Sequence, residues 1–389
     1  MNATLNPEVL QWARKKAGLT EETLAKKIGV QLGLVKEWES SGSIPINLVE
    51  KLAEKTRIAF GFLFLKELPR ENLPIADFRA PGEAVPHMPS DDLLEVIYEA
   101  QRKQNWYREF LISNDAKPLP FVGRYSLNTP VMDVAASIRE TVKIGSELRN
   151  QTSEKEKTIG LMTEAVENCG ILVLRSGFAG PGTYKGRKLD RSEFQGFALS
   201  DEYAPLIFVN GADFPAAQIF TIAHELAHIW IGKTGVSILE KTYSPGSDIE
   251  TFCNRVAAEV LLPISELRDS WKKQSDYTSQ IERIAYKFRI SRIVVARRAH
   301  DAGIITDEQF FSYYRRIGTP PEKPKATWSD YFKNEKYRNS RIFSVAILQE
   351  TFAGRVMERD AMQFLGIKKE PTLKKYAQSL QEGMGWPIF

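Results

Sequence analysis

Cysteine is scarce in this chain: only two of its 389 residues, Cys169 and Cys253, carry a thiol. Two cysteines in so long a chain do not form the disulfide framework of small secreted proteins, and such low use is typical of the cytosol. The first 30 residues carry charges throughout and lack the apolar segment of a secretory signal. We therefore expect a cytoplasmic protein.

Long apolar runs and a strong net charge are missing as well. No stretch approaches the roughly 18 apolar residues that a membrane-spanning helix needs, so we expect no membrane partner. The net charge is +4, which permits nucleic-acid binding but does not argue for it. The length predicts two or three domains, with ample chain for a hydrophobic core. Nothing here indicates an oligomeric state.

Histidine is the third scarce residue, since the chain has only four, yet two of them share one short motif. The run IFTIAHELAHIWIG (219–232) places His224, Glu225 and His228 in an HExxH pattern. In a helix, residues four apart share a face, so both imidazoles can bind one zinc ion while Glu225 serves as general base. The competing interpretation, two core histidines that only form hydrogen bonds, is less favoured because the motif is specific in a histidine-poor chain.

The boundaries of this predicted helix follow from its neighbours. Asp213 is a candidate N-cap, Pro215 suits the first turn, and Gly232 marks the end. The helix is apolar nearly all round, which predicts that it is buried. Its buried histidines and carboxylate then require partners, and a metal ion would supply them.

Catalytic zinc needs a third protein ligand, and two carboxylates compete in the next predicted helix, 247–263. Glu250 and Glu259 are nine residues apart, about 180° round a helix, so both cannot face one metal ion. Glu250 is favoured because Asn254 lies one turn further on its face, where its side chain can hold a ligand imidazole. Glu259 is the alternative.

Two other interpretations of this helix remain open. Ser247 and Glu250 have the spacing of a capping box, in which the glutamate only closes the helix start. Cys253 lies three residues after Glu250, so a zinc–thiolate bond is also possible.

The motifs together resemble the ImmA/IrrE family of zinc metallopeptidases, over about residues 89–305. The resemblance implies an α+β protein with a zincin core similar to that of thermolysin-like enzymes. It implies zinc on His224, His228 and Glu250, with Glu225 as general base. The best-known members of the family cut helix-turn-helix repressors, which implies a protein substrate. The matching runs are GFALSDEYAPLIFVN (196–210), TIAHELAHIW (221–230) and E-x-x-C-N-x-x-A-A-E-x-L-L-P (250–263).

Residues 1–65 predict an all-α unit of four helices with apolar residues at helical spacing. With K-E-W-E closing the third helix, this unit resembles an Xre-type helix-turn-helix domain, in which that helix enters the major groove. On the expected DNA face, only Gln31 and Lys36 can form hydrogen bonds with bases or phosphates. The Glu37 carboxylate would be repelled by the DNA phosphates. DNA binding and a protein-contact module therefore both remain open.

Residues 66–90 are rich in proline and predict a linker. We expect this linker to pack against a neighbour, because Leu73, Ile75 and Phe78 are too apolar for free coil.

We expect a metallopeptidase domain over 91–317, closed by a helical segment, and a small α-rich region over 318–389. Arg292, Arg297 and Arg298 give the closing segment a basic face, for which packing is favoured over a second DNA-binding unit.

The predicted strands GFALS and PLIFVN (196–200 and 205–210) lead into the zinc helix. We expect one of them to present a free edge on which an extended peptide substrate adds as a further strand. Tyr243 is a candidate donor to the oxyanion of the transition state. His87 and His300 are expected to lie outside the metal site.

These patterns predict a cytoplasmic zinc endopeptidase that hydrolyses a protein substrate, such as a helix-turn-helix repressor or an antitoxin-like partner. The alternative is a DNA-binding transcriptional regulator, or a component of a toxin–antitoxin or prophage system, whose metal core is a sensor or scaffold.

Overall fold

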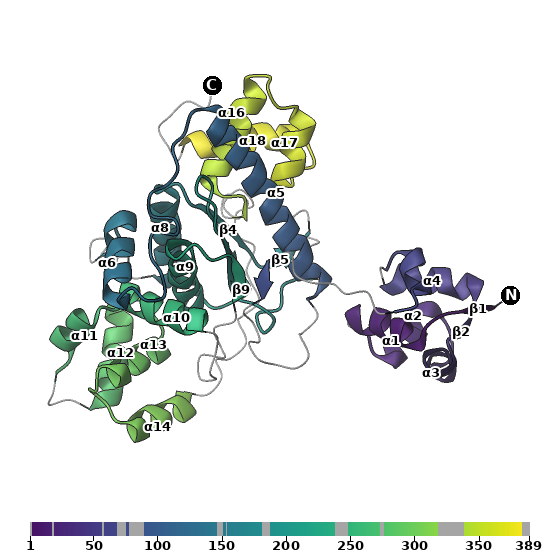
Figure 1. The fold of residues 1–389 in the computed structure, drawn as a ribbon, viewed down its shortest axis with the longest axis horizontal. Helices are drawn as coiled ribbons and strands as arrows, with labels where there is room; N and C mark the ends of the chain where they lie inside the picture. Colours follow the sequence, from purple (N-terminus) through teal and green to yellow (C-terminus); the bar gives the residue numbers. More distant parts are fainter. Residues whose placement is uncertain are drawn as a thin grey trace. The chain divides into compact units, whose positions relative to one another are not determined.

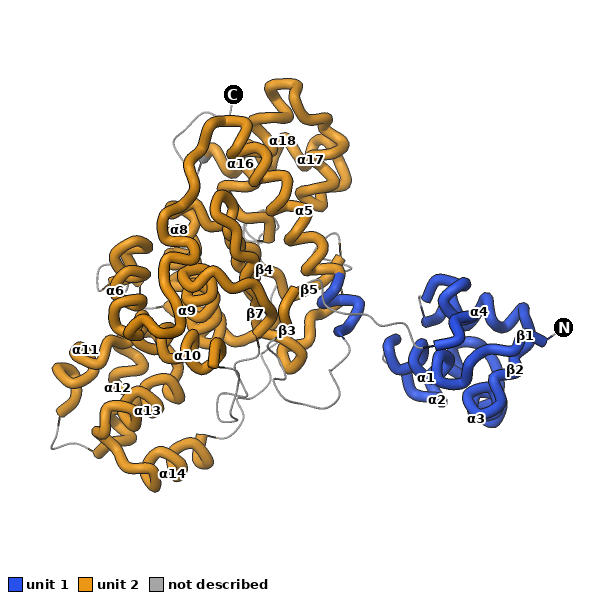
Figure 2. Tube along the Cα trace, viewed as in Figure 1, with its two compact units in different colours: residues 1–73, 87–94 blue, residues 74–86, 95–389 orange. Residues whose placement is uncertain are grey.

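The protein is a mixed α+β chain, mainly helical with a small sheet, which confirms the predicted class (Figure 1). It divides into two compact units, residues 1–73 with 87–94 and residues 74–86 with 95–389 (Figure 2). The second unit contains the predicted metallopeptidase domain, its closing helices and the C-terminal region together. The predicted boundary between 317 and 318 therefore stays a prediction. The computed structural model describes residues 2–17, 19–56, 58–67, 75–77, 89–145, 151–152, 154–180, 187–237, 248–272, 276–317 and 338–382.

The first unit contains the four helices that the sequence predicts. Thr20 caps α2 by accepting a hydrogen bond from the Thr23 amide, and Gly29, with φ 82°, ends that helix in the left-handed conformation. The turn after Gly29 leads directly into α3, so α2 and α3 form a helix-turn-helix. The elements are β1 (Asn2–Thr4), α1 (Pro7–Lys16), α2 (Glu21–Ile28), α3 (Leu32–Ser41), β2 (Ser43–Pro45), α4 (Ile46–Thr56) and the 3-10 helix η1 (Phe60–Phe64).

A buried ion pair fixes α1 against α3 in this unit. The Arg14 guanidinium donates from Nε and Nη2 to the two carboxylate oxygens of Glu39, at 2.6 and 2.7 Å. Gly42 follows α3 with φ 71°, and a Cβ there would lie 2.1 Å from the carbonyl oxygen of Leu5. Only glycine fits this position, because the neighbouring atom belongs to backbone and cannot move aside.

The second unit is built round a five-stranded sheet with the order β3-β9-β7-β8-β4. β7 pairs antiparallel with β8 and with β9, whereas β4 with β8 and β3 with β9 are parallel. The expectation that β7 or β8 presents a free edge is wrong, because each is paired on both sides. The strands are β3 (Ala76–Asp77), β4 (Leu172–Ser176), β7 (Gly196–Leu199), β8 (Leu206–Asn210) and β9 (Gly235–Ser237), with a small separate hairpin of β5 (Phe178–Ala179) and β6 (Arg187–Lys188).

Helices on one side of the sheet form the main core. α9 (Pro215–Trp230) packs on β7 and β8 and contacts α6 (Val131–Val142), α8 (Lys155–Glu167) and α10 (Asp248–Leu261). Figure 1 shows these four helices grouped to one side of the strands in that view. Because α9 has neighbours on every side, its nearly all-apolar surface is buried, as the sequence predicts.

The closing segment consists of α11 (Ile264–Ser270), α12 (Tyr277–Phe288), α13 (Arg292–Asp301) and α14 (Asp307–Ile317). The three arginines predicted to form a basic face each lie beside an acidic group: Arg292 beside Glu282, Arg297 beside Asp301, and Arg298 beside Glu259. Arg298 is buried. These pairs support packing rather than DNA contact.

A buried polar cluster joins the C-terminal helices to α5 (Asp91–Ser113). Lys103, only 1% exposed, donates to Glu99 at 2.7 Å and to the Asn339 amide oxygen at 2.8 Å. Asn339 in turn donates to the Leu365 carbonyl. One ammonium group therefore links segments that are 236 positions apart. The C-terminal helices are α16 (Arg341–Phe352), α17 (Glu358–Leu365) and α18 (Glu370–Glu382).

Across the described residues, no helix combines the length and the apolar character that a bilayer span requires.

We expect Lys103→Met to lower the free energy of unfolding by about 2–4 kcal/mol, because it removes the ammonium donor of the buried Asn339 and of the half-buried Glu99. Lys157→Met is the matched control, since it removes a lysine from an exposed pair with Glu154 and should change stability by less than about 0.5 kcal/mol. Urea unfolding followed by circular dichroism measures both. Equal effects of the two substitutions would contradict a structural role for Lys103.

Candidate metal centre

The HExxH helix begins and ends close to where the sequence places it. Pro215 is its first residue, and Gly232, with φ 65°, follows the last turn. The expectation that Asp213 is the N-cap is wrong, because the N-cap is Phe214. Asp213 stands one residue too early, and its carboxylate accepts a hydrogen bond from the Phe214 amide at 2.7 Å.

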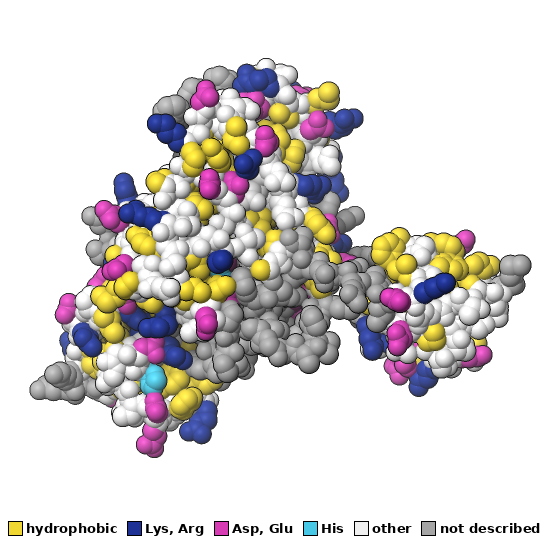
Figure 3. Space-filling model, viewed as in Figure 1, with side chains coloured by type: hydrophobic (Ala, Val, Ile, Leu, Met, Phe, Trp, Pro, Cys, Tyr) yellow, Lys and Arg dark blue, Asp and Glu magenta, His cyan; other side chains and the backbone are white. Residues whose placement is uncertain are grey.

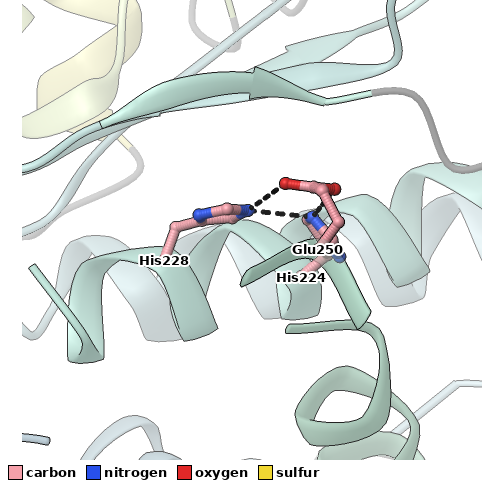
Figure 4. Close-up of side chains that lie close together, drawn as sticks. All are labelled: His224, His228 and Glu250. Carbon is pink, nitrogen blue, oxygen red and sulfur yellow. Dashed lines mark hydrogen bonds and ion pairs between the residues drawn. The ribbon is translucent and has the colours of Figure 1, made fainter. Parts of the chain in front are cut away.

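Three side chains from α9 and α10 converge on one point (Figure 4). The Nε2 atoms of His224 and His228 are 3.0 Å apart. The two carboxylate oxygens of Glu250 lie 3.2 Å from Nε2 of His224 and 3.1 Å from Nε2 of His228. The structure thus brings together the three residues that the sequence predicts as metal ligands.

This donor set fits a zinc ion. Ligand atoms held tetrahedrally at roughly 2.0–2.1 Å from zinc lie about 3.3 Å apart, close to the observed separations. The cluster is also buried: both imidazoles are fully inaccessible, and Glu250 is 6% exposed. Buried groups of this polarity require compensation, and a divalent cation would provide it for all of them at once.

Glu225 lies next to this cluster and is fully buried. Neither carboxylate oxygen accepts a hydrogen bond of ordinary geometry from a described residue. Burial raises the pKa of Glu225 to about 8, and Glu250 adds to the increase, while His224 and the hydroxyl of Ser237 oppose it. A cation held by the neighbouring ligands would favour the ionised form, which a general base must have.

The three predicted ligands influence one another's ionisation. Burial opposes ionisation of Glu250, but the adjacent His224 and His228 lower its pKa to about 2. Burial also opposes protonation of both histidines: Glu250 overcomes it and raises the pKa of His224, whereas the pKa of His228 stays lowered. Glu250 is therefore held as a carboxylate, the form that binds metal.

Asn254 lies where the helix geometry places it, on the Glu250 face of α10. Asn254 contributes to the raised pKa of His224, although its side-chain oxygen and Nδ1 of His224 have no hydrogen-bond partner of ordinary geometry among the described residues. This position suits the predicted role of holding the imidazole in the orientation that a metal ligand needs.

The two alternative ligands lie in other surroundings. Glu259 forms an ion pair with Arg298 and accepts a hydrogen bond from the Ile264 amide at 3.3 Å. Cys253 is buried and is not among the converging groups, and burial raises its pKa well above the usual range.

Two further histidines, His87 and His300, are predicted to lie outside the metal site, and the structure describes only His300. The His300 side chain is 28% exposed and pairs with Asp307, away from the converging ligands. His87, Tyr243 and Ser247 lie outside the described residues, so the oxyanion donor and the capping box stay predictions.

Two residues that no sequence motif marks, Gly196 and Ser237, lie beside Glu225. Gly196 on β7 lies against it, since a Cβ there would be 2.5 Å from Thr221, 2.8 Å from the Phe208 carbonyl and 3.1 Å from Glu225 Oε1. Ser237, fully buried on β9, is the register partner of Gly196. No local signal marks either residue, because the pairing of β7 with β9 is what brings them to Glu225.

Three family models match parts of the chain. Residues 166–300 match the IrrE N-terminal-like domain of the Peptidase_M78 model, residues 10–63 match the helix-turn-helix model HTH_3, and residues 339–379 match a domain of unknown function, DUF8813. A helix-turn-helix domain is thus followed by an IrrE N-terminal-like domain, as the resemblance to the ImmA/IrrE family predicts. No curated protein and no solved structure matches the chain.

We expect Glu250→Gln to lower zinc affinity about 100-fold or more, because it removes the carboxylate that faces both histidines. Glu259→Gln makes the same chemical change on the same helix and should leave zinc affinity unchanged, since that carboxylate faces Arg298. Mass spectrometry of dialysed protein and competition with a chromophoric chelator measure both. Zinc loss in Glu259→Gln alone would reverse the ligand assignment.

Proposed function

We propose that this chain, which combines a helix-turn-helix domain with an IrrE N-terminal-like domain, is a zinc-dependent endopeptidase of protein substrates. The observation that carries the proposal is the convergence of His224, His228 and Glu250 on one point beside the buried Glu225. The match of residues 166–300 to a peptidase family supports it independently. A zincin core similar to that of thermolysin-like enzymes is part of the proposal.

The proposed reaction is hydrolysis of a peptide bond. Zinc, when bound by the two histidines and Glu250, supplies Lewis-acid polarisation of the scissile carbonyl. Glu225 takes a proton from the attacking water molecule while the water oxygen forms a bond to the carbonyl carbon. The C–N bond then breaks, and Glu225 delivers the proton to the departing amine nitrogen. Burial of Glu225 keeps bulk water from competing for that proton.

Asn254 acts in this scheme as a positioning residue. With zinc bound, its side-chain oxygen would accept a hydrogen bond from Nδ1 of His224; both atoms lack a partner of ordinary geometry among the described residues. The substrate that the family resemblance implies is a helix-turn-helix repressor or an antitoxin-like protein. We place the reaction in the cytoplasm, in keeping with two cysteines that are both free.

We expect Glu225→Gln to keep zinc and to lower the cleavage rate by about 10²–10⁴-fold, because an amide cannot accept and return the proton. Cleavage of a proteome-derived peptide library, with products identified by mass spectrometry, measures this at equal zinc content. Glu266→Gln, on α11, is the control and should cleave as the unmodified chain does. Full activity of Glu225→Gln would rule out its role as general base.

A second candidate function is DNA binding by the N-terminal domain. The observation that favours it is the helix-turn-helix match at residues 10–63, with Gln31 and Lys36 exposed at α3. The electrostatic support is thin, since acidic and basic side chains are interspersed on the face shown in Figure 3. In this alternative, the metal centre would serve as a sensor or scaffold of a transcriptional regulator.

If the domain binds DNA, Lys36→Ala should weaken binding about three- to tenfold and reduce the salt dependence by about one phosphate contact. Lys55→Ala removes a lysine from α4 instead and should have little effect. Fluorescence anisotropy with duplexes selected from a random pool, at several salt concentrations, measures both. Failure to select any duplex would leave protein contact as the role of this domain.

A further inference from the structure

The proposed catalytic residues are inaccessible to solvent in this structure. His224, Glu225 and His228 have no accessible surface, and Glu250 has almost none. A peptidase must bring its scissile carbonyl within hydrogen-bond reach of the general base. Some part of the chain beside Glu225 must therefore move before a protein substrate can be cleaved.

β9 is the strand that lies beside Glu225. Its residues Gly235, Val236 and Ser237 are all buried, and Ser237 is the register partner of Gly196, the β7 residue that lies against Glu225. One edge of β9 pairs with β7. The other edge of β9, one strand away from β7, is therefore the position on this side of the sheet at which a further strand can join.

That position already holds a strand of the same chain. β3 pairs with β9 in parallel, with Ala76 opposite Gly235 and Asp77 opposite Val236. β3 belongs to the segment that the sequence predicts as the linker between the helix-turn-helix domain and the peptidase domain. An inter-domain segment thus occupies the sheet edge nearest to the metal centre.

β3 is weakly held compared with the rest of the sheet. Within the described residues 75–77 it has two residues, whereas β7 and β8 have four and five, all buried. Ala76 is exposed and Ile75 is half-buried. So short a ladder supplies few hydrogen bonds, each of small net value, so a competing segment can replace it.

We infer that the outer edge of β9 is the docking edge for an extended segment of the substrate, and that β3 is a resident occupant which the substrate displaces. The inference rests on the proposed function and deepens it by naming how substrate entry is controlled. Main-chain hydrogen bonds between the substrate segment and β9 supply the binding affinity. Alternate side chains of that segment determine which substrate sequences are preferred. The occupant indicates that preference: an aliphatic residue at the Ile75 position, then a small residue opposite Gly235.

A resident strand lowers the apparent affinity for a competitor in proportion to the fraction of time for which the edge is free. Proline substitution in β3 tests this directly. Successive N–H groups of a strand point to opposite sides, so one of Ala76→Pro and Asp77→Pro removes a donor to β9, and the other serves as its matched control.

The experiment uses full-length, zinc-loaded Glu225→Gln protein, which binds without cleaving, and a fluorescein-labelled peptide with the sequence of residues 73–79. Fluorescence anisotropy measures binding to this protein alone and with each proline. We expect about tenfold tighter binding with one of the two prolines and a change of less than about twofold with the other. Glu83→Pro, elsewhere in the same segment, should also have no effect.

Equal affinity for all four proteins, or no binding to any of them, would overturn the inference. The proposed function is judged separately, by cleavage in the unmodified chain. The predicted affinity difference without any cleavage would support the docking edge and count against the peptidase proposal. Cleavage that depends on Glu225, together with equal peptide affinity of the proline variants, would support the peptidase proposal and contradict the docking edge.

Discussion

The central constraint in this protein is the burial of two imidazoles and two carboxylates at the contact between α9 and α10. His224, His228 and Glu250 lie with their polar atoms about 3 Å apart, and Glu225 lies beside them without an ordinary hydrogen-bond donor among the described residues. Such a group is unfavourable inside a protein unless a cation or a hydrogen-bond network compensates it. The rest of the core holds both helices in place, and the proposed chemistry depends on that placement.

The sheet completes the site from the other side. β7 lies against Glu225 through Gly196, where any side chain would collide with backbone, and β9 brings Ser237 next to the same carboxylate. β3 then extends the sheet with a segment that precedes α9 and α10 by more than a hundred positions. In the proposed function, access to the candidate metal centre and the path of the inter-domain segment are linked through one sheet edge.

Several site features followed from helix geometry alone. The four-residue spacing placed His224 and His228 on one face, and the opposite faces of Glu250 and Glu259 left one of them as ligand. Asn254 on the Glu250 face then favoured Glu250, and the structure brings these three residues together. Other expectations failed for identifiable reasons. Asp213 is one residue too early to cap α9, because the chain turns at Phe214. β7 and β8 have no free edge, because β4 and β9 pair with their outer sides.

The sequence by itself determined the helix-turn-helix, the HExxH helix and the strands that precede it, and it favoured Glu250 over Glu259, because each of these depends on residues within a few turns of one another. Only the tertiary structure decided which strands became neighbours, that Gly196 and Ser237 flank Glu225, and that Ala76–Asp77 covers the edge of β9. Those contacts join distant segments, and strand pairing depends on the whole packed core, so no local pattern in the chain specifies them.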